Sequence, residues 1–331
     1  MNKFFKGMKF GLQASALALS LSVAAHVQAK SGYVFVSSEK DDVVTVFDAK
    51  GMSKVTEIKT SERPRAMQLS KDGSLLYVAC GDDDAIDVID VAALKVKKSI
   101  DIGEDPDRFD ISPDEKFLYA SNEDDGLVTV YSLEEDKKVA EIEVGEEPEG
   151  VLVSPDNRLV YIASEVANMI HVIDVESREI IENIVVGNRP RRMELTADLK
   201  ELWVSNEVGG TITILDTATY KQTAELTFAP KGMRAESISP VGMAMTKDGK
   251  LAYVTLGNAN HVAVVDTATH KVIDYVLVGK RAWGISLNGD ESKLYVTNGK
   301  SDDLAVIDTS ALKVIKSVPA GRVPHDVVVD D

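Results

Sequence analysis

The chain has 331 residues, of which 44% are hydrophobic, and its formal net charge is −17 at pH 7. A surface this acidic repels phosphate backbones and anionic lipids, so the composition argues against nucleic acid and membrane-surface partners and favours cationic ones. Cys80 is the only cysteine, which excludes an internal disulfide and a covalent C-x-x-C-H haem.

Residues 1–29 are predicted to be a secretory signal peptide. A lysine-containing start without acidic residues precedes an apolar run over about residues 11–25, and Val27-Gln28-Ala29 places small residues where a signal peptidase reads. The apolar run is shorter than the ~20 residues that span a bilayer. We expect cleavage after Ala29, a periplasmic mature chain with no membrane insertion, and a net charge of −20 once the three lysines at positions 3, 6 and 9 are lost.

Residues 30–331 read as one unit repeated seven times. An aromatic residue recurs at steps of 44, 42, 42, 42, 50 and 42 residues, and the residue that ends the third apolar run of each repeat recurs at steps of 42, 42, 42, 42, 50 and 42. The aromatic positions are Tyr33, Tyr77, Tyr119, Tyr161, Trp203, Tyr253 and Tyr295, and the second positions are Asp48, Asp90, Ser132, Asp174, Asp216, Asp266 and Asp308. This period, with four strand-like runs per repeat, is typical of a β-propeller.

We therefore predict an all-β fold, a seven-bladed propeller whose blades are four-stranded antiparallel sheets with strands a, b, c and d running outward from the axis. The chain starts with a b strand at 33–37 and has no a strand before it. Residues 323–330 match the a-strand pattern of 63–70, so they are expected to pair with the N-terminal blade and close the ring. The recurrent aspartates are expected to accept backbone N–H groups in the c–d turns.

Acidic residues cluster in several loops between strands b and c. The loops read EKDD at 39–42, GDDD at 81–84, NEDDG at 122–126 and KSDD at 300–303. Hard cations prefer several carboxylate oxygens, but no loop has the spacing of a preformed calcium loop. Both a metal site and a solvated acidic rim stay open; the candidate ligands are Asp82, Asp83, Asp84, Glu123, Asp124 and Asp125.

The residues that open the a strands are expected to ring the mouth of the central channel, on the face of the d–a and b–c loops. A ring with segregated charge and one aromatic residue can hold a small polar ligand, although mixed charges can equally neutralise one another in a wet channel. The candidate ligand-binding residues are Arg65, Asp107, Arg108, Glu149, Arg191, Arg192, Trp283 and His325.

The eight extra residues of the long step fall in the d–a connection at 229–239, on the same face, where Lys231 and Arg234 could reach over the mouth. Loops that break a repeat are common sites of function. Equally, the loop can have become longer during evolution without acquiring any function.

The motifs KLYVTNG, RPRRMELT, VAVVDTATHKV and LVYIASE resemble the YVTN family of β-propeller repeats over residues 30–331. The stretches NEDDGLVTV (122–130), ELWVSNEVGGTITILD (201–216) and SPVGMAMTKDGKLAYVTLGNANHVAVVD (239–266) are most similar to the PQQ-dependent catabolism-associated β-propeller proteins. Ala282, in place of a proline, and Ser132, in place of the turn aspartate, depart from the repeat. The resemblance implies a periplasm in which a quinoprotein dehydrogenase oxidises alcohols, and it brings no catalytic residues.

Three function classes follow. The expectation is a non-catalytic periplasmic binding or scaffold propeller associated with PQQ-dependent alcohol oxidation, whose partner is a quinoprotein dehydrogenase or its redox partner. The alternatives are a lactonase-like hydrolase with Glu149 or Asp107 as base, and a metal-binding accessory protein that uses the acidic loop face. Four histidines and two tryptophans after residue 29, with no P-loop and no G-x-S-x-G motif, lead us to expect no cofactor and to lean against an enzyme.

Overall fold

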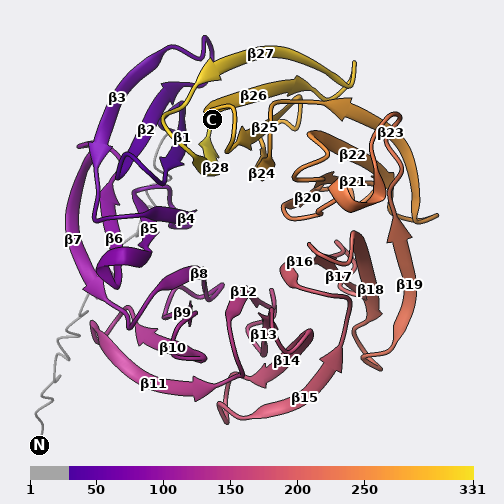
Figure 1. The fold of residues 1–331 in the computed structure, drawn as a ribbon. Helices are drawn as coiled ribbons and strands as arrows, with labels where there is room; N and C mark the ends of the chain where they lie inside the picture. The colour runs from indigo at the N-terminus through magenta and orange to yellow at the C-terminus, as the bar shows by residue number, and fades with distance from the viewer. Residues whose placement is uncertain (1–29) are drawn as a thin grey trace, which may run out of the picture.

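A computed structural model describes residues 30–331, which form a closed ring of seven blades around a central axis (Figure 1). Each blade is a four-stranded antiparallel sheet, so the predicted fold class is confirmed. The predicted signal peptide, residues 1–29, lies outside the described residues. Among residues 30–331, no helix is long and apolar enough to cross a membrane.

The blades follow one another along the chain, and the first is completed by the last strand. Blade 1 contains β28 (Pro324–Asp330), β1 (Tyr33–Ser38), β2 (Val43–Asp48) and β3 (Lys54–Lys59). Blade 2 contains β4 (Pro64–Leu69), β5 (Leu75–Cys80), β6 (Ala85–Asp90) and β7 (Lys95–Asp101). Blade 3 contains β8 (Pro106–Ile111), β9 (Phe117–Asn122), β10 (Leu127–Ser132) and β11 (Lys137–Glu143). Blade 4 contains β12 (Pro148–Val153), β13 (Leu159–Ser164), β14 (Met169–Asp174) and β15 (Ile180–Val185).

The remaining blades repeat this order. Blade 5 contains β16 (Pro190–Leu195), β17 (Glu201–Asn206), β18 (Thr211–Asp216) and β19 (Gln222–Thr227). Blade 6 contains β20 (Met243–Met245), β21 (Leu251–Thr255), β22 (His261–Asp266) and β23 (Lys271–Leu277). Blade 7 contains β24 (Ala282–Leu287), β25 (Lys293–Asn298), β26 (Asp303–Asp308) and β27 (Lys313–Pro319). Two 3-10 turns, η1 (Gly81–Asp83) and η2 (Ala235–Ser237), lie in connections.

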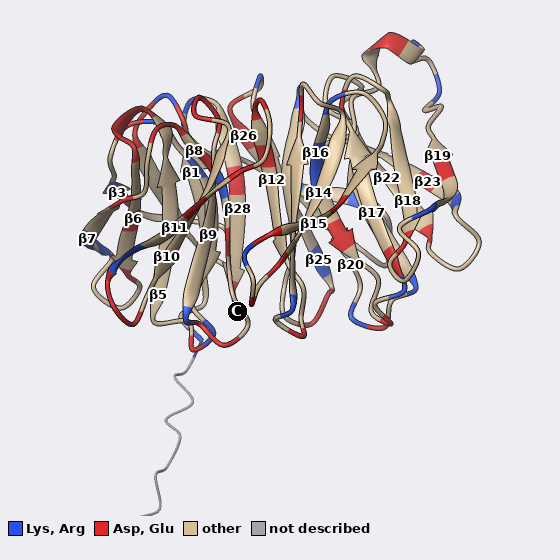
Figure 2. Ribbon diagram, turned by 90° about the horizontal axis from the view of Figure 1, so that it is seen from below, with Lys and Arg blue, Asp and Glu red and all other residues tan. Residues whose placement is uncertain are grey.

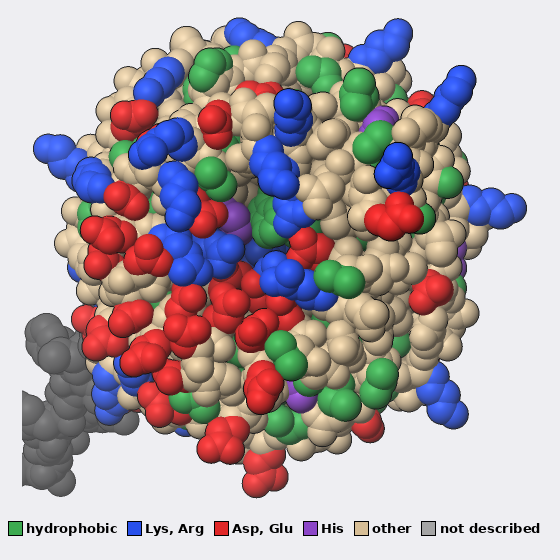
Figure 3. Space-filling view, viewed as in Figure 1, with side chains coloured by type: hydrophobic (Ala, Val, Ile, Leu, Met, Phe, Trp, Pro, Cys, Tyr) green, Lys and Arg blue, Asp and Glu red, His purple; other side chains and the backbone are tan. Residues whose placement is uncertain are grey.

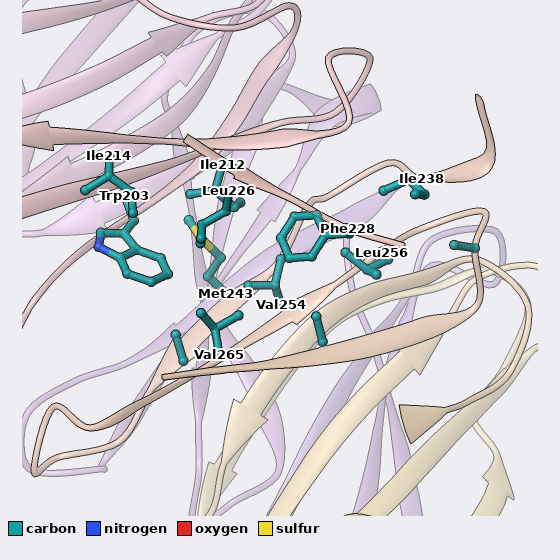
Figure 4. Close-up of a cluster of buried hydrophobic side chains, with 13 residues drawn as sticks. Trp203, Ile212, Ile214, Leu226, Phe228, Ile238, Met243, Val254, Leu256 and Val265 are labelled. Carbon is teal, nitrogen blue, oxygen red and sulfur yellow. The ribbon is translucent and has the colours of Figure 1, made fainter. Parts of the chain in front are cut away.

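The second and third strands of each blade are buried on both faces, which explains their continuous apolar runs. In β13, every residue after Leu159 is buried, whereas the outermost strand β15 exposes four of its six residues and buries only Ile184. The buried side chains fill the spaces between adjacent blades. Figure 4 shows one such cluster, in which Trp203 and Ile212 of blade 5 pack with Met243 and Val254 of blade 6.

Closure of the ring occurs as predicted, since β28 pairs antiparallel with β1 from Tyr33↔Asp330 to Ser38↔Pro324. Lys30 also contacts this strand, with its Nζ 2.9 Å from the Asp330 carboxylate. Because closure leaves no open inner-strand edge, the first and last segments of the chain stabilise each other.

The recurrent aspartates form the predicted c–d turns. Asp216 Oδ1, for example, accepts hydrogen bonds from the backbone N–H and the hydroxyl of Thr219, at 2.8 and 2.6 Å. At the one serine position, Ser132 Oγ accepts the backbone N–H of Glu135 at 3.1 Å. The serine therefore keeps the turn that the aspartate makes elsewhere, which is why this departure leaves the repeat intact.

Candidate functional site in the central channel

The first strands of the blades line the axis at very close spacing. At Gly150, Gly242 and Gly284 a Cβ atom would lie 2.4–2.5 Å from a backbone oxygen of the next blade, so no side chain fits there. The corresponding residue of blade 3 is Arg108 and that of blade 5 is Arg192. Two guanidinium groups therefore enter a channel that is otherwise closely packed by backbone.

One side of the channel mouth is filled by a layer of ion pairs centred on Arg191. Its guanidinium contacts Glu149, and lies 2.8 Å from Glu165 and 2.7 Å from Glu207. All four side chains are at most 6% exposed. Burial alone would raise the pKa of Glu149, but Arg191, Arg65 and Arg192 lower it to about 2. Burial and the charge of Glu149 raise the pKa of the neighbouring Glu165 to about 8.

The layer continues into blades 2 and 3 through Arg65. This side chain contacts Asp107 and lies 3.9 Å from Glu123 and 4.0 Å from Glu39. Burial and the charge of Glu149 raise the pKa of Glu123. The sequence-predicted residues Arg65, Asp107, Glu149 and Arg191 are thus brought together, but chiefly to bind one another.

The other side of the mouth is aromatic and apolar. Trp283 lies beside His325, with ring centroids 5.4 Å apart, and beneath the Arg281 guanidinium, 4.2 Å from the ring centroid. Both nitrogens of His325 are buried and, within residues 30–331, have no hydrogen-bond partner. Burial, followed by the nearby arginines, lowers its pKa well below the usual value, so this histidine is neutral. Figure 3 shows blue and red side chains gathered over the axis beside a hollow with hydrophobic side chains.

Below this mouth lies a cavity of 240 Å³ on the axis. Its wall includes four sequence-predicted residues, Arg108, Arg192, Trp283 and His325, and it adds polar residues that the sequence did not single out: Gln68, Asp110, Glu194 and Asp326. The volume lies just below the usual range for ligand pockets, roughly 300–1,000 Å³, so the cavity suits only a small molecule.

Arg192 is a buried cation on the cavity wall without a close counterion. Its side chain is 9% exposed, its Nη1 donates to the backbone oxygen of Glu149 at 2.9 Å, and the nearest carboxylates, those of Asp107 and Glu149, are 3.9 Å away. Burial and the charge of Arg108 lower the pKa of Arg192 to about 9. Arg108 itself lies 3.2 Å from Asp326. Because a buried charge is costly without a partner, this pair of arginines favours binding of an anion in the cavity.

Glu194 is the acidic group of the cavity that has no partner. No hydrogen bond or ion pair joins its carboxyl group to the rest of residues 30–331, whereas Asp110 accepts hydrogen bonds from Gln68 and Val153, both at 2.8 Å. Burial raises the pKa of Glu194 to about 7, although Arg108 opposes the shift. A carboxyl group that titrates near neutral pH in a cavity is suited to general acid–base chemistry.

The acidic b–c loops chiefly bind the neighbouring d–a connections. Asp82 pairs with Arg63 at 2.9 Å, and Asp83 and Asp84 accept the backbone N–H groups of Glu62 and Asp105. Asp124 and Asp125 are exposed. Of the six predicted metal ligands, only Glu123 meets other carboxylates in a compact group, formed with Asp107 and Glu149.

The long connection at 229–239 follows β19 and stands out beyond the neighbouring loops on this face (Figure 2). The Ala229 N–H donates to the Tyr275 hydroxyl, and the Ser239 hydroxyl accepts the Asn258 N–H. No hydrogen bond described for residues 30–331 joins Lys231 or Arg234 to the channel. Cys80 is buried, and burial raises the pKa of its thiol, in agreement with an unreactive core residue.

The fold and the channel together define a seven-bladed β-propeller with a cavity on its axis that is lined partly by polar residues. The model of the family described as "Lactonase, 7-bladed beta-propeller" matches residues 19–95 and 105–180. The match covers just under half of the chain and makes it similar to that family. No curated protein sequence gives a match.

Solved structures share the same ring. Hydrazine synthase from Kuenenia stuttgartiensis has a TM-score of 0.78 at 23% identity, over 85% of this chain and 93% of that one. The periplasmic gluconolactonase of Pseudomonas aeruginosa has a TM-score of 0.76 at 16% identity, over 90% and 99% of the two chains. A putative 6-phosphogluconolactonase from Bacteroides fragilis has a TM-score of 0.76 at 16% identity, over 91% and 99%. At these identities the likeness shows the fold alone, and the YVTN and quinoprotein-associated grouping gains no support from it.

Proposed function

We propose that the protein hydrolyses a small anionic lactone in the axial cavity, with Glu194 as the general base. The observation that carries the proposal is the placement of an unpartnered Glu194, with its pKa near 7, in the same cavity as Arg108 and the uncompensated Arg192. The similarity to the seven-bladed lactonase family supports the same reaction class.

The chemistry of ring opening uses these groups in distinct roles. Ionised Glu194 accepts a proton from water as the water oxygen attacks the lactone carbonyl carbon. The carbonyl oxygen becomes an oxyanion, which an arginine of the cavity stabilises. The C–O bond of the ring then breaks, the leaving alkoxide takes the proton from Glu194, and the product is an open-chain hydroxy acid.

The buried arginines also indicate the charge of the substrate. Arg192 has no carboxylate within 3.8 Å, and Arg108 has one, at 3.2 Å from Asp326. A substituent such as a carboxylate or phosphate would supply the missing counterion and pair with a planar guanidinium. The 240 Å³ volume limits the substrate to a compact ring.

The carboxylates expected from the sequence are less suited to be the base. Glu149 and Asp107 are tied to Arg191 and Arg65, and the pKa of Glu149 is lowered to about 2. A carboxylate with so low a pKa is a weak base and accepts a proton poorly at neutral pH. The layer of ion pairs therefore shapes the mouth, and Glu194 is the better candidate for the chemistry.

The test is hydrolysis of a panel of aldonolactones, with and without a carboxylate or phosphate substituent, followed in a pH-stat. We expect Glu194→Gln to lower kcat by about 10²–10⁴-fold and to leave Tm unchanged at pH 5, where the folded protein keeps Glu194 protonated. The matched control is Glu225→Gln, which removes an exposed carboxylate from β19 and should retain full activity. Absence of turnover of every lactone by the wild-type protein would contradict the proposal.

The sequence resemblance supports a second reading, in which the same cavity binds a ligand without turnover in a periplasm that contains a quinoprotein alcohol dehydrogenase. One experiment distinguishes the catalytic function from the non-catalytic one. Saturable binding of an anionic ligand that depends on Arg192, with no hydrolysis of any lactone, would favour the non-catalytic reading. Export itself is tested by the intact mass of the native protein, which should begin at Lys30.

A further inference from the structure

Three carboxylates from two neighbouring blades meet at the channel mouth. Asp107 is the second residue of β8, Glu123 follows β9 in the same blade, and Glu149 is the second residue of β12. Each offers one carboxylate oxygen, and these three oxygens all lie within 4.8 Å of one another. Asp107 and Glu149 are buried, and Glu123 reaches the group from the rim of the mouth.

Two of these carboxylates have a buried oxygen that nothing in the described chain satisfies. Arg65 contacts Asp107 Oδ1 and Arg191 contacts Glu149 Oε1, which leaves Oδ2 and Oε2. Both of these oxygens lack a hydrogen-bond partner within residues 30–331, and their side chains are 1% and 2% exposed. Buried carboxylate oxygens are costly when they are left unpaired.

The two free oxygens both face the guanidinium of Arg192. Both lie 3.9 Å from the guanidinium of Arg192, one from Nη2 and the other from Nη1. That distance exceeds a hydrogen bond, so Arg192 faces the oxygens without satisfying them.

We propose that Asp107, Glu123 and Glu149 bind a calcium ion, which bridges blades 3 and 4 at the mouth. Calcium accepts oxygen ligands at about 2.3–2.6 Å, so ligands on opposite sides of the ion stand roughly 4.6–5.2 Å apart. The three oxygens, which all lie within 4.8 Å of one another, can therefore share one calcium ion. Magnesium, with bonds of about 2.0–2.1 Å, would require a tighter group.

The test uses the full mature protein after treatment with EDTA, titrated with calcium chloride in a calorimeter and in a thermal melt. We expect saturable binding, and a rise in Tm on the order of 2–6 °C at a hundredfold excess over Kd, because the ion binds only the folded ring. Magnesium chloride at the same concentration should give a smaller rise.

Two variants locate the ion. Glu123→Gln removes the partly exposed ligand with little change in volume and should abolish the calcium heat and the Tm shift. Asp124→Asn makes the same charge change on the next, exposed residue and should retain both. No heat and no shift in the wild-type protein, or full binding by Glu123→Gln, would overturn the site. Neither readout measures turnover, so failure here is distinct from failure of lactone hydrolysis at Glu194.

Discussion

Arg191 and Arg192 are adjacent in β16, yet they lie in two different regions of the channel. Arg191 is surrounded by three carboxylates of the mouth, and their charges raise its pKa despite burial. Arg192 faces the cavity below with no carboxylate within hydrogen-bond distance, and its pKa is lowered to about 9. The difference indicates that charge in the mouth layer stabilises the ring, whereas charge in the cavity is left for a ligand.

The largest effect is expected from breaking the mouth layer. Arg191→Met would leave Glu149, Glu165 and Glu207 buried around a missing cation, and uncompensated buried charge of this kind costs roughly 3–5 kcal/mol. Chemical denaturation measures the loss. The control is Lys200→Met, which breaks an exposed pair with Asp198 and should change the free energy of unfolding by no more than about 0.5 kcal/mol. Equal effects of the two changes would contradict the comparison.

Substitution of the neighbouring residue, Arg192, should distinguish an effect on protein stability from an effect on ligand binding. Arg192→Met removes an uncompensated buried charge and one hydrogen bond to Glu149 O, so we expect stability to change by less than about 1 kcal/mol. Affinity for an anionic ligand should fall on the order of 10–100-fold, as expected for loss of a charge-assisted hydrogen bond. Calorimetry with the best lactone or its hydroxy-acid product gives the affinity. Destabilisation as large as that of Arg191→Met would show that Arg192 is structural.

A further difference is expected in the pH dependence of stability. The pKa of Glu194 is raised in the folded protein to about 7, above its ordinary value near 4.5, so the folded state binds this proton more tightly. Its contribution to stability is full below pH 4.5 and is lost as the pH rises through 7. Glu194→Gln should therefore lose less stability than the wild-type protein between pH 5 and pH 8, as measured by denaturant melts. Parallel curves for the two proteins would contradict the raised pKa.

The sequence predicted the ring well because its signals repeat. The six aromatic residues from Tyr77 to Tyr295 occupy equivalent buried positions, each the third residue of its strand, and the turn at Ser132 survives a change of residue. In blade 1 the prediction was wrong by two residues, because the equivalent buried position is that of Phe35 and Tyr33 is only partly buried at the start of β1. Closure by β28 followed from the missing first strand. These features serve every blade in the same way, so seven copies reinforce one another.

The cavity could be predicted only in part because it depends on residues that differ between blades. Arg108, Arg192, Trp283 and His325 follow directly on the a-strand openings and were found. Glu194 lies further along β16, beyond a register shift between Pro190 and Met193. The equivalent residues of other blades include Leu152, Ala244 and Ser286, so no repeated signal marks the position. Whether a carboxylate of the mouth forms an ion pair also depends on arginines from other blades, and the sequence of one repeat does not show them.

The most direct test of the account is the pH profile of kcat/KM for the preferred lactone. If Glu194 is the base in the free enzyme, the wild-type profile rises with pH through an apparent pKa of about 7, because the carboxyl group must lose its proton. The residual activity of Glu194→Gln should lack this rising limb. A wild-type profile that is flat from pH 5 to pH 8, or the same rising limb in the variant, would contradict the assignment of the chemistry to the cavity.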